Sequence, residues 1–396
     1  MSHTLAKHIL AAEESQTLAI ANRAKVMKSQ GIDVVSLSTG EPDFPTPDCA
    51  KQAANDAIAH DFTHYTDSNG IKELREAVAE KFRSENGIAL ASADTVIITT
   101  GAKQALVNTL SALCNEGDEV IIFAPYWVSY PAMVTMTGAK PVIITTLAEN
   151  NFKPTPEQLR QALSPQTKCV IFNSPNNPTG MMLTRDEMAQ LLAVLENHDC
   201  YILSDEIYEK LTLGSIDHCS PGSFPSVASR VCTVNGVSKA FAMTGWRIGF
   251  LHAPPQVWKQ ASKVQGQVTS HPSSIAQKAA LGAMLGAQHD VEIMREVFCK
   301  RKELICRLMS AIPSISFAEP QGAFYVWADI SRILTKEIPS SAAFCEKLLA
   351  DYYLALVPGE AFGTQGYIRL SFAASDDVII EAIRRLAAMV HDMEKK

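Results

Sequence analysis

Hydrophobic and polar positions follow two spacings that alternate along this chain. Short apolar runs rich in valine and isoleucine predict buried strands, whereas apolar residues spaced three and four apart predict amphipathic helices. The predicted strands cover residues 34–37, 96–100, 120–123, 141–146, 169–172, 201–203, 231–234 and 248–252. The predicted helices cover residues 15–30, 47–60, 71–86, 101–114, 156–163, 184–197, 275–287 and 291–312.

The order of these elements predicts the fold class. Strands and helices alternate up to about residue 285, which indicates an α/β protein with a mostly parallel sheet flanked by crossover helices. Beyond that point the pattern changes to strands at 322–327, 356–359 and 367–372 with helices at 344–351 and 376–393. This remainder predicts a smaller α+β domain.

Composition excludes several function classes. The chain has 396 residues, long enough for a large domain and a smaller one, and a net charge of −7 with no basic stripe for nucleic acid. No apolar run is long enough to span a bilayer, and residues 1–10 lack the centre of a signal peptide. Nine scattered cysteines without a CxxC pair favour free thiols in a reducing cytosol over disulfides or zinc. We therefore expect a cytoplasmic protein without a metal site, with Cys169, Cys200 and Cys232 in its core.

Two irregular loops follow predicted strands. Residues 38–47 read S-T-G-E-P-D-F-P-T-P, and residues 173–180 read N-S-P-N-N-P-T-G. Proline and glycine at this density forbid regular structure. The first loop is either an ordinary connector or a loop that lays backbone N–H groups and Gly40 against a ligand. The second is predicted to be a rigid loop whose asparagine amides point in definite directions.

Three further strand ends carry candidate chemistry. A helix start at Gly101, Ala102 and Lys103 directly after a strand is a geometry that binds phosphate through backbone N–H groups, although this signal is weaker than a GxGxxG motif. Trp127 follows the next strand, and ligands collect at that edge of an α/β sheet. Asp205 ends another strand, either as a cap for the next turn or as a functional carboxylate.

Residues 234–249 (V-N-G-V-S-K-A-F-A-M-T-G-W-R-I-G) are the centre of the sequence interpretation. Lys239 stands among small and apolar neighbours, and Arg247 follows eight positions later. The alternative is an ordinary solvated lysine. Burial lowers the pKa of a lysine, and a neutral amine can form a Schiff base. We therefore interpret Lys239 as the residue that holds an aldehyde cofactor, with Arg247 on its phosphate.

Taken together, these residues resemble a known family along essentially the whole chain. The ordered set resembles the class I aminotransferases, pyridoxal-phosphate enzymes of fold type I, and within them the bacterial branch of aspartate and aspartate/prephenate aminotransferases. That resemblance implies a large cofactor-binding domain at residues 48–287 and a small domain built from both termini, residues 1–47 and 288–396. The motifs that carry it are Gly40 to Pro47, Tyr65, Gly101 to Gln104, Asn176 to Gly180, Asp205 with Tyr208, Ser238-Lys239, Gly245-Trp246-Arg247 and Arg369.

The resemblance implies a role for each catalytic residue. Lys239 would carry pyridoxal 5'-phosphate as an internal aldimine and then shuttle the substrate's Cα proton to the cofactor. Asp205 would keep the pyridine nitrogen protonated, which makes the ring an electron sink. Tyr208 and Asn177 would hydrogen-bond the phenolic oxygen, and Trp127 would stack on the ring.

The resemblance also implies the groups that hold the phosphate and the substrate. Arg247, Ser238 and the backbone of Gly101, Ala102 and Lys103 would bind the phosphate, with Tyr65 reaching in from the other subunit of a homodimer. The substrate's α-carboxylate would be held by Arg369, helped by Gly40 and Asn177. The distal carboxylate would be bound by Lys103, because a lysine beside the positive end of a helix dipole favours an anionic partner. Trp127, Ser15 and Thr17 would lie near the substrate.

The predicted reaction is transamination between L-aspartate and 2-oxoglutarate in two half-reactions. Alternatives on the same fold are an aminotransferase preferring prephenate, aromatic acids or alanine, and a β-lyase. From another class, a regulatory protein could bind the cofactor without turnover, but such proteins usually carry a basic DNA-binding domain that this sequence lacks. The predicted partners are therefore amino and oxo acids and a second copy of the chain, with no nucleic acid and no membrane.

Overall fold

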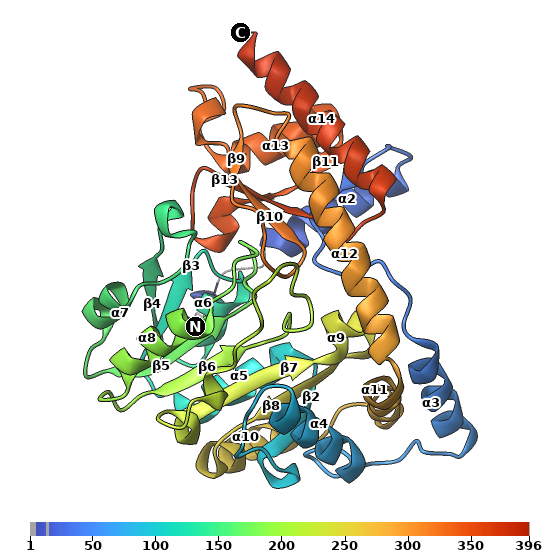
Figure 1. Cartoon of the computed structure of the whole chain (residues 1–396), viewed down its shortest axis with the longest axis vertical. Coiled ribbons are helices and arrows are strands. Elements are labelled where there is room, and N and C mark those ends of the chain that lie inside the picture. The colour runs from blue at the N-terminus through green and yellow to red at the C-terminus, as the bar shows by residue number, and fades with distance from the viewer. Residues whose placement is uncertain (1–4, 13–15, 396) are drawn as a thin grey trace, which may run out of the picture.

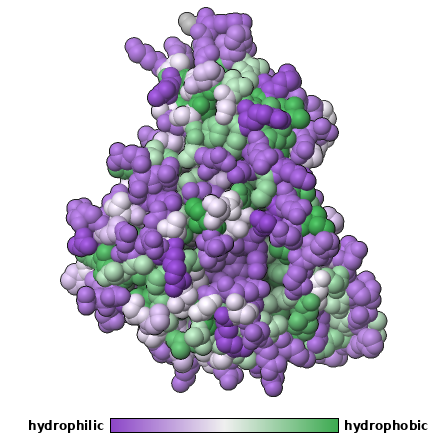
Figure 2. Space-filling view, in the orientation of Figure 1, coloured by the Kyte–Doolittle hydropathy of each residue, from purple (hydrophilic) through white to green (hydrophobic). Residues whose placement is uncertain are grey.

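The computed structural model describes residues 5–12 and 16–395. Figure 1 shows a lower part built around a large sheet and an upper part built around a smaller one. The long helix α12 (Gln288–Met309) runs from α11 (Ser274–Gly286) in the lower part to the upper part, where it packs against α14 (Asp376–Glu394). Hydrophilic residues cover most of the face shown in Figure 2, with apolar residues in scattered patches.

The large sheet has seven strands within the described residues, in the order β2-β8-β7-β6-β5-β3-β4. All neighbouring pairs are parallel except those of β8, which is antiparallel to both β2 and β7. The predicted mostly parallel α/β sheet is thereby confirmed. The strands are β2 (Val96–Thr100), β3 (Glu119–Ala124), β4 (Lys140–Thr145), β5 (Thr167–Asn173), β6 (Tyr201–Asp205), β7 (Val231–Gly236) and β8 (Ile248–His252).

Helices cover both faces of this sheet because successive strand residues point to opposite sides. Apolar side chains of α5, α6 and α10 pack on one face, and those of α3, α4, α8 and α11 pack on the other. Cys169, Cys200 and Cys232 lie in these cores, as predicted. The helices, besides those bounded above, are α1 (Lys7–Leu10), α2 (Gln16–Ser29), α3 (Asp48–Ala59), α4 (Lys72–Ser84), α5 (Ala102–Leu113), α6 (Ser129–Met136), α7 (Pro156–Ala162), α8 (Arg185–Leu195), α9 (Val237–Ala240), α10 (Pro255–Val268) and α13 (Ser341–Tyr352).

The smaller sheet is built from residues 316–371, and a separate two-stranded sheet beside it joins the two ends of the chain. The smaller sheet's four strands are antiparallel, in the order β12 (Val357–Pro358), β13 (Tyr367–Ser371), β10 (Tyr325–Asp329) and β9 (Ser316–Phe317). Beside it, β1 (Val35–Ser36) pairs in parallel with β11 (Leu354–Ala355). The domain division at residues 47 and 287 stays a prediction.

Four α-helices of the described residues lie outside the predicted set, namely α1, α6, α9 and α10. α6 contains Pro131 and four other residues with low helix propensity, and it forms because Tyr130, Met133 and Val134 are buried against the sheet. α10 begins at Pro255, where proline at the first helical position favours a start. Within the described residues, every helix is too short or too polar to cross a bilayer.

Candidate active site

One cavity of about 380 Å³ collects most of the predicted site residues. It lies where the carboxyl ends of the large sheet's parallel strands face the smaller sheet, the edge at which α/β proteins bind ligands. Gly101 lies directly behind it, against Arg247. The predicted residues that line the cavity are Thr17, Gly40, Ala102, Lys103, Trp127, Asn177, Asp205, Tyr208, Ser238, Lys239, Arg247 and Arg369.

Lys239 reaches into this cavity from α9, the single turn of helix that follows β7. Its Nζ donates a hydrogen bond to the backbone carbonyl of Gly40. Burial lowers the pKa of Lys239 to about 8, with Glu41 opposing that shift and the nearby arginines adding to it. A lowered pKa makes the neutral, nucleophilic amine far more accessible near neutral pH than in an ordinary lysine.

Asp205 ends β6 and is fully enclosed by protein. Its carboxylate accepts a hydrogen bond from the Tyr130 hydroxyl at 2.7 Å and one from the Ile207 backbone N–H at 3.3 Å. Burial raises the pKa of Asp205 to about 6, although these two hydrogen bonds act in the opposite direction. A cationic N–H partner in the cavity would hold this carboxylate in its ionised form.

The loop 173–180 is held against Asp205 by its own asparagines. The Asn173 side-chain amide donates to the Asp205 carbonyl, and its oxygen accepts from the Asn177 backbone N–H, both at 3.0 Å. These two bonds fix Asn177, whose side-chain oxygen accepts from Arg369 at 2.9 Å. The asparagine-rich loop is therefore a rigid part of the site and no plain connector.

Arg369 is a buried cation on β13. It donates to the Asn177 side chain and, at 2.7 Å, to the Ser38 carbonyl, while its Nε has no hydrogen-bond partner among the described residues. Its guanidinium packs over the rings of Tyr325 and Phe362. Since its described hydrogen-bond partners are neutral oxygens, this cation suits a carboxylate ligand.

A second positive region lies at the start of α5. Gly101 caps the helix with a φ of 77°, and a Cβ there would lie 2.3 Å from Arg247 Nη2. Only glycine therefore lets the arginine approach the helix N-terminus. Lys103 stands on the first turn with its Nζ 4.9 Å from the Trp127 ring, and burial and repulsion from Arg247 lower its pKa. Two cations at a helix N-terminus favour an anionic ligand.

Of the remaining predicted residues, Tyr65 does not line this cavity. Tyr65 is 91% exposed on the loop between α3 and α4, where its ring meets His271 edge to face. It is therefore a surface residue of this chain, outside the lining of its own cavity. Ser15 lies outside the described residues.

Three side chains of the site received no individual role in the sequence analysis. Tyr130 lies on the unpredicted helix α6 and hydrogen-bonds Asp205, and Asn173 braces the asparagine loop. Tyr325 begins β10 and lines the cavity beside Tyr208. The 322–327 run was predicted only as a strand, because nothing in a strand pattern says which residue faces a cavity formed with another sheet.

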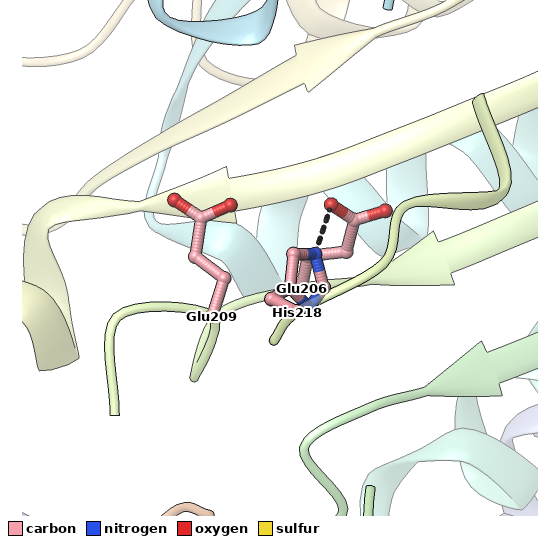
Figure 3. Close-up of side chains that lie close together, drawn as sticks. All are labelled: Glu206, Glu209 and His218. Atoms are coloured by element: carbon pink, nitrogen blue, oxygen red, sulfur yellow. Dashed lines mark hydrogen bonds and ion pairs between the residues drawn. The ribbon is translucent and has the colours of Figure 1, made fainter. Parts of the chain in front are cut away.

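An acidic cluster lies behind Asp205, on the opposite side of the same segment. Glu206, Glu209 and His218 hold their ligand-type atoms within 4.8 Å of one another, and Figure 3 shows the Glu206–His218 contact, which is 2.9 Å long. Lys81 forms an ion pair with Glu209, and Asn86 donates to both glutamates. Because Lys81 already supplies the compensating charge, this is a buried ion-pair network that supports the Asp205–Tyr208 segment.

A lowered-pKa lysine, an enclosed carboxylate and a buried arginine in one cavity define an enzyme of amine and carboxylate chemistry. The family model for class I and II aminotransferases matches residues 32–386, so the chain belongs to that family. It is 44% identical to the aspartate/prephenate aminotransferase of Cereibacter sphaeroides, over 98% of both chains. It is 43% identical to the aspartate aminotransferase of Geobacillus stearothermophilus, over 96% of this chain and 98% of that one.

Solved structures agree with these sequence relatives. The aspartate aminotransferase from Thermus thermophilus with maleate matches with a TM-score of 0.93 and 42% identity, over 98% of this chain and all of that one. The predicted fold type and family are thereby confirmed.

Proposed function

We propose that this protein is a pyridoxal-phosphate-dependent aminotransferase that moves the amino group of L-aspartate to 2-oxoglutarate. The observation that carries the proposal is the convergence of Lys239, Asp205 and Arg369 on one cavity. The three come from different elements of the chain and supply an amine, an acid and a carboxylate-binding cation.

The cavity's donor set fits the cofactor. The α5 N-terminus, Ser238 and Arg247 suit its phosphate, and the close packing of Gly101 on Arg247 forms the cradle. Asp205, with a pKa raised by burial, suits a protonated ring nitrogen. When bound, pyridoxal phosphate supplies an aldehyde for the amine and a ring that withdraws electrons.

Each residue around the cofactor would have its own role. Lys239 would hold the cofactor and take the proton from the substrate's Cα. Asp205 would keep the ring nitrogen protonated, with Tyr130 fixing the carboxylate in place. Tyr208 and Asn177 would bind the phenolic oxygen, and Trp127 would cover one face of the ring.

Substrate recognition is assigned to the two cationic regions. Arg369 would bind the α-carboxylate with a fixed, forked set of donors, supported by Asn177 and the Gly40 backbone. Lys103 would bind the distal carboxylate from the start of α5, with Thr17 beside the substrate. Prephenate is a second candidate amino acceptor, because two relatives of this chain are named aspartate/prephenate aminotransferase.

The exposed position of Tyr65 supports the proposal that the protein is a homodimer. We propose that the Tyr65 hydroxyl reaches the phosphate region of the partner subunit, because Tyr65 is exposed and does not line its own cavity. A cytosolic location, expected from the free cysteines, stays a prediction.

The experiment that tests this function is spectroscopic and kinetic. The purified protein loaded with pyridoxal phosphate should show a visible absorbance band that aspartate bleaches and 2-oxoglutarate restores. Rates over aspartate, glutamate, alanine, aromatic amino acids and prephenate would then rank the alternatives. A protein that binds the cofactor with no turnover of any of these would contradict the proposal.

A further inference from the structure

Tyr325 lies where the two sheets meet at the cavity. Its side chain is 1% exposed, and it enters the site from β10 of the smaller sheet. Its hydroxyl lies 2.8 Å from that of Tyr208, which follows β6 of the large sheet. Its ring lies 4.4 Å from the guanidinium carbon of Arg369. One side chain therefore contacts both a group proposed for the cofactor and the group proposed for the substrate carboxylate.

The hydrogen bond between Tyr325 and Tyr208 affects the direction of the Tyr208 hydroxyl proton. Each hydroxyl has one proton to donate, so only one of the pair donates in this hydrogen bond. When Tyr325 donates to the Tyr208 oxygen, the proton of Tyr208 is free to point into the cavity. Hydrogen bonds in such a chain strengthen one another. In that arrangement Tyr325 prepares Tyr208 to donate to an acceptor in the cavity.

The contact with Arg369 restrains the guanidinium. Its central carbon lies over the Tyr325 ring, a cation–π contact that stabilises the cation without using any N–H donor. Two of its nitrogens are held by Asn177 and Ser38, and Nε has no described partner. Because the ring restrains the position of the guanidinium, its remaining donors stay available to a bound carboxylate.

We propose that Tyr325 is a positioning residue that links the two halves of the site. Its hydroxyl orients the Tyr208 proton, and its ring holds Arg369. This inference rests on the proposed function, since it concerns how the same cavity holds its cofactor and substrate.

A double-mutant cycle tests the hydroxyl. Wild type, Tyr325→Phe, Tyr208→Phe and the double variant are loaded with pyridoxal phosphate, and the visible band is titrated with pH. Donors to the phenolic oxygen favour the deprotonated form of the Lys239–cofactor link, so their loss raises the midpoint. Tyr325→Phe should raise it by roughly 0.5 pH unit. Tyr208→Phe should raise it further, and the double variant should equal Tyr208→Phe.

The ring is tested separately by steady-state kinetics. Tyr325→Leu should raise KM about tenfold for aspartate and alanine alike, because both carry the α-carboxylate. Tyr325→Phe, which keeps the ring, should restore KM to near the wild-type value. The matched control is Tyr367→Phe on β13, whose ring stacks on Trp327 away from the cavity and which should change neither readout. Melting curves of the cofactor-free variants establish that each is folded.

Failure of this inference is distinguishable from failure of the proposed function. A wild-type protein that forms no visible band on loading contradicts the function itself. If the wild type forms the band, two results would overturn only the role of Tyr325. One is a Tyr325→Phe variant whose pH midpoint is unshifted, and the other is a double variant whose shift equals the sum of the two single shifts.

Discussion

Gly40 packs directly against the hydroxyl of Tyr325. A Cβ at position 40 would lie 2.3 Å from the Tyr325 oxygen and 3.4 Å from the ring carbon that bears it. This contact joins the 38–47 loop to the smaller sheet. In the same loop, the Gly40 carbonyl accepts the hydrogen bond that Lys239 Nζ donates. The glycine in S-T-G-E-P is thus explained by a close approach and not only by backbone freedom.

The first prediction follows from that contact. Gly40→Ala should displace the loop and lower kcat/KM by roughly 10- to 100-fold, in line with a few kcal/mol of overpacking. Tyr325→Phe removes the offending oxygen and leaves the new methyl at a tolerable distance. The double variant should therefore be more active than Gly40→Ala alone, as measured by initial rates with aspartate. An equally poor double variant would show that the clash lies elsewhere.

The second prediction concerns Lys103. Because it is assigned to the distal carboxylate, Lys103→Ala should raise KM for aspartate by roughly 10- to 100-fold, the effect of losing a charge-assisted hydrogen bond. KM for alanine, which has no second carboxylate, should change far less. Lys51→Ala, on the exposed face of α3, serves as the control. Equal effects on both substrates would refute the assignment.

The third prediction tests the trans role of Tyr65 through mixed dimers. Tyr65→Ala and Lys239→Ala subunits, each poorly active alone, are co-purified as a hybrid. If Tyr65 serves the partner's cavity, one of the two sites in the hybrid is intact and activity returns. If it serves its own cavity, one site of the hybrid lacks Tyr65 and the other lacks Lys239, so neither site is intact. A hybrid no more active than its parents would therefore contradict the proposed shared site.

The fourth prediction concerns the acidic cluster. Burial alone would lower the pKa of His218, but the pairing with Glu206 and the charge of Glu209 raise it above the usual value. A pKa raised in the folded state stabilises the fold below the unfolded value, about 6.5, and this stability is lost as pH rises through the folded pKa. The melting temperature of wild type should therefore exceed that of His218→Gln most at pH 6.

The same comparison at higher pH provides the contrast. Above the folded pKa of His218 both proteins carry a neutral side chain, so the difference in melting temperature should shrink. Melts of both proteins at intervals from pH 6 to pH 9 would follow this trend. A difference that stays constant with pH would mean that His218 is neutral in the fold throughout.

Much of the site could be predicted because its residues follow strands directly. Asp205 ends a strand, Lys239 and Asn177 follow strands within a few residues, and the carboxyl ends of parallel strands meet at one edge. Arg369 was identified from the family resemblance, since a lone arginine inside a strand pattern gives no functional signal. Local sequence thus indicated the chemistry, and the order of motifs along the chain indicated the family.

The parts that could not be predicted depend on long-range packing. Tyr130 lies on a helix whose own propensity is poor and which is held by burial against the sheet. The antiparallel direction of β8 follows from the path of the chain and not from its apolar pattern. Tyr325 reaches the cavity only because β10 pairs with β13 in a register that sets it across from Ser371.

The central claim is that Lys239 is the amine that holds the cofactor, opposite Asp205. The most direct test is to load the protein with pyridoxal phosphate, reduce it with borohydride, digest it and map the modified lysine by mass spectrometry. We expect the stable adduct on Lys239, and no visible band or adduct at that position in Lys239→Ala. An adduct found instead on Lys103, or spread over surface lysines, would contradict the account.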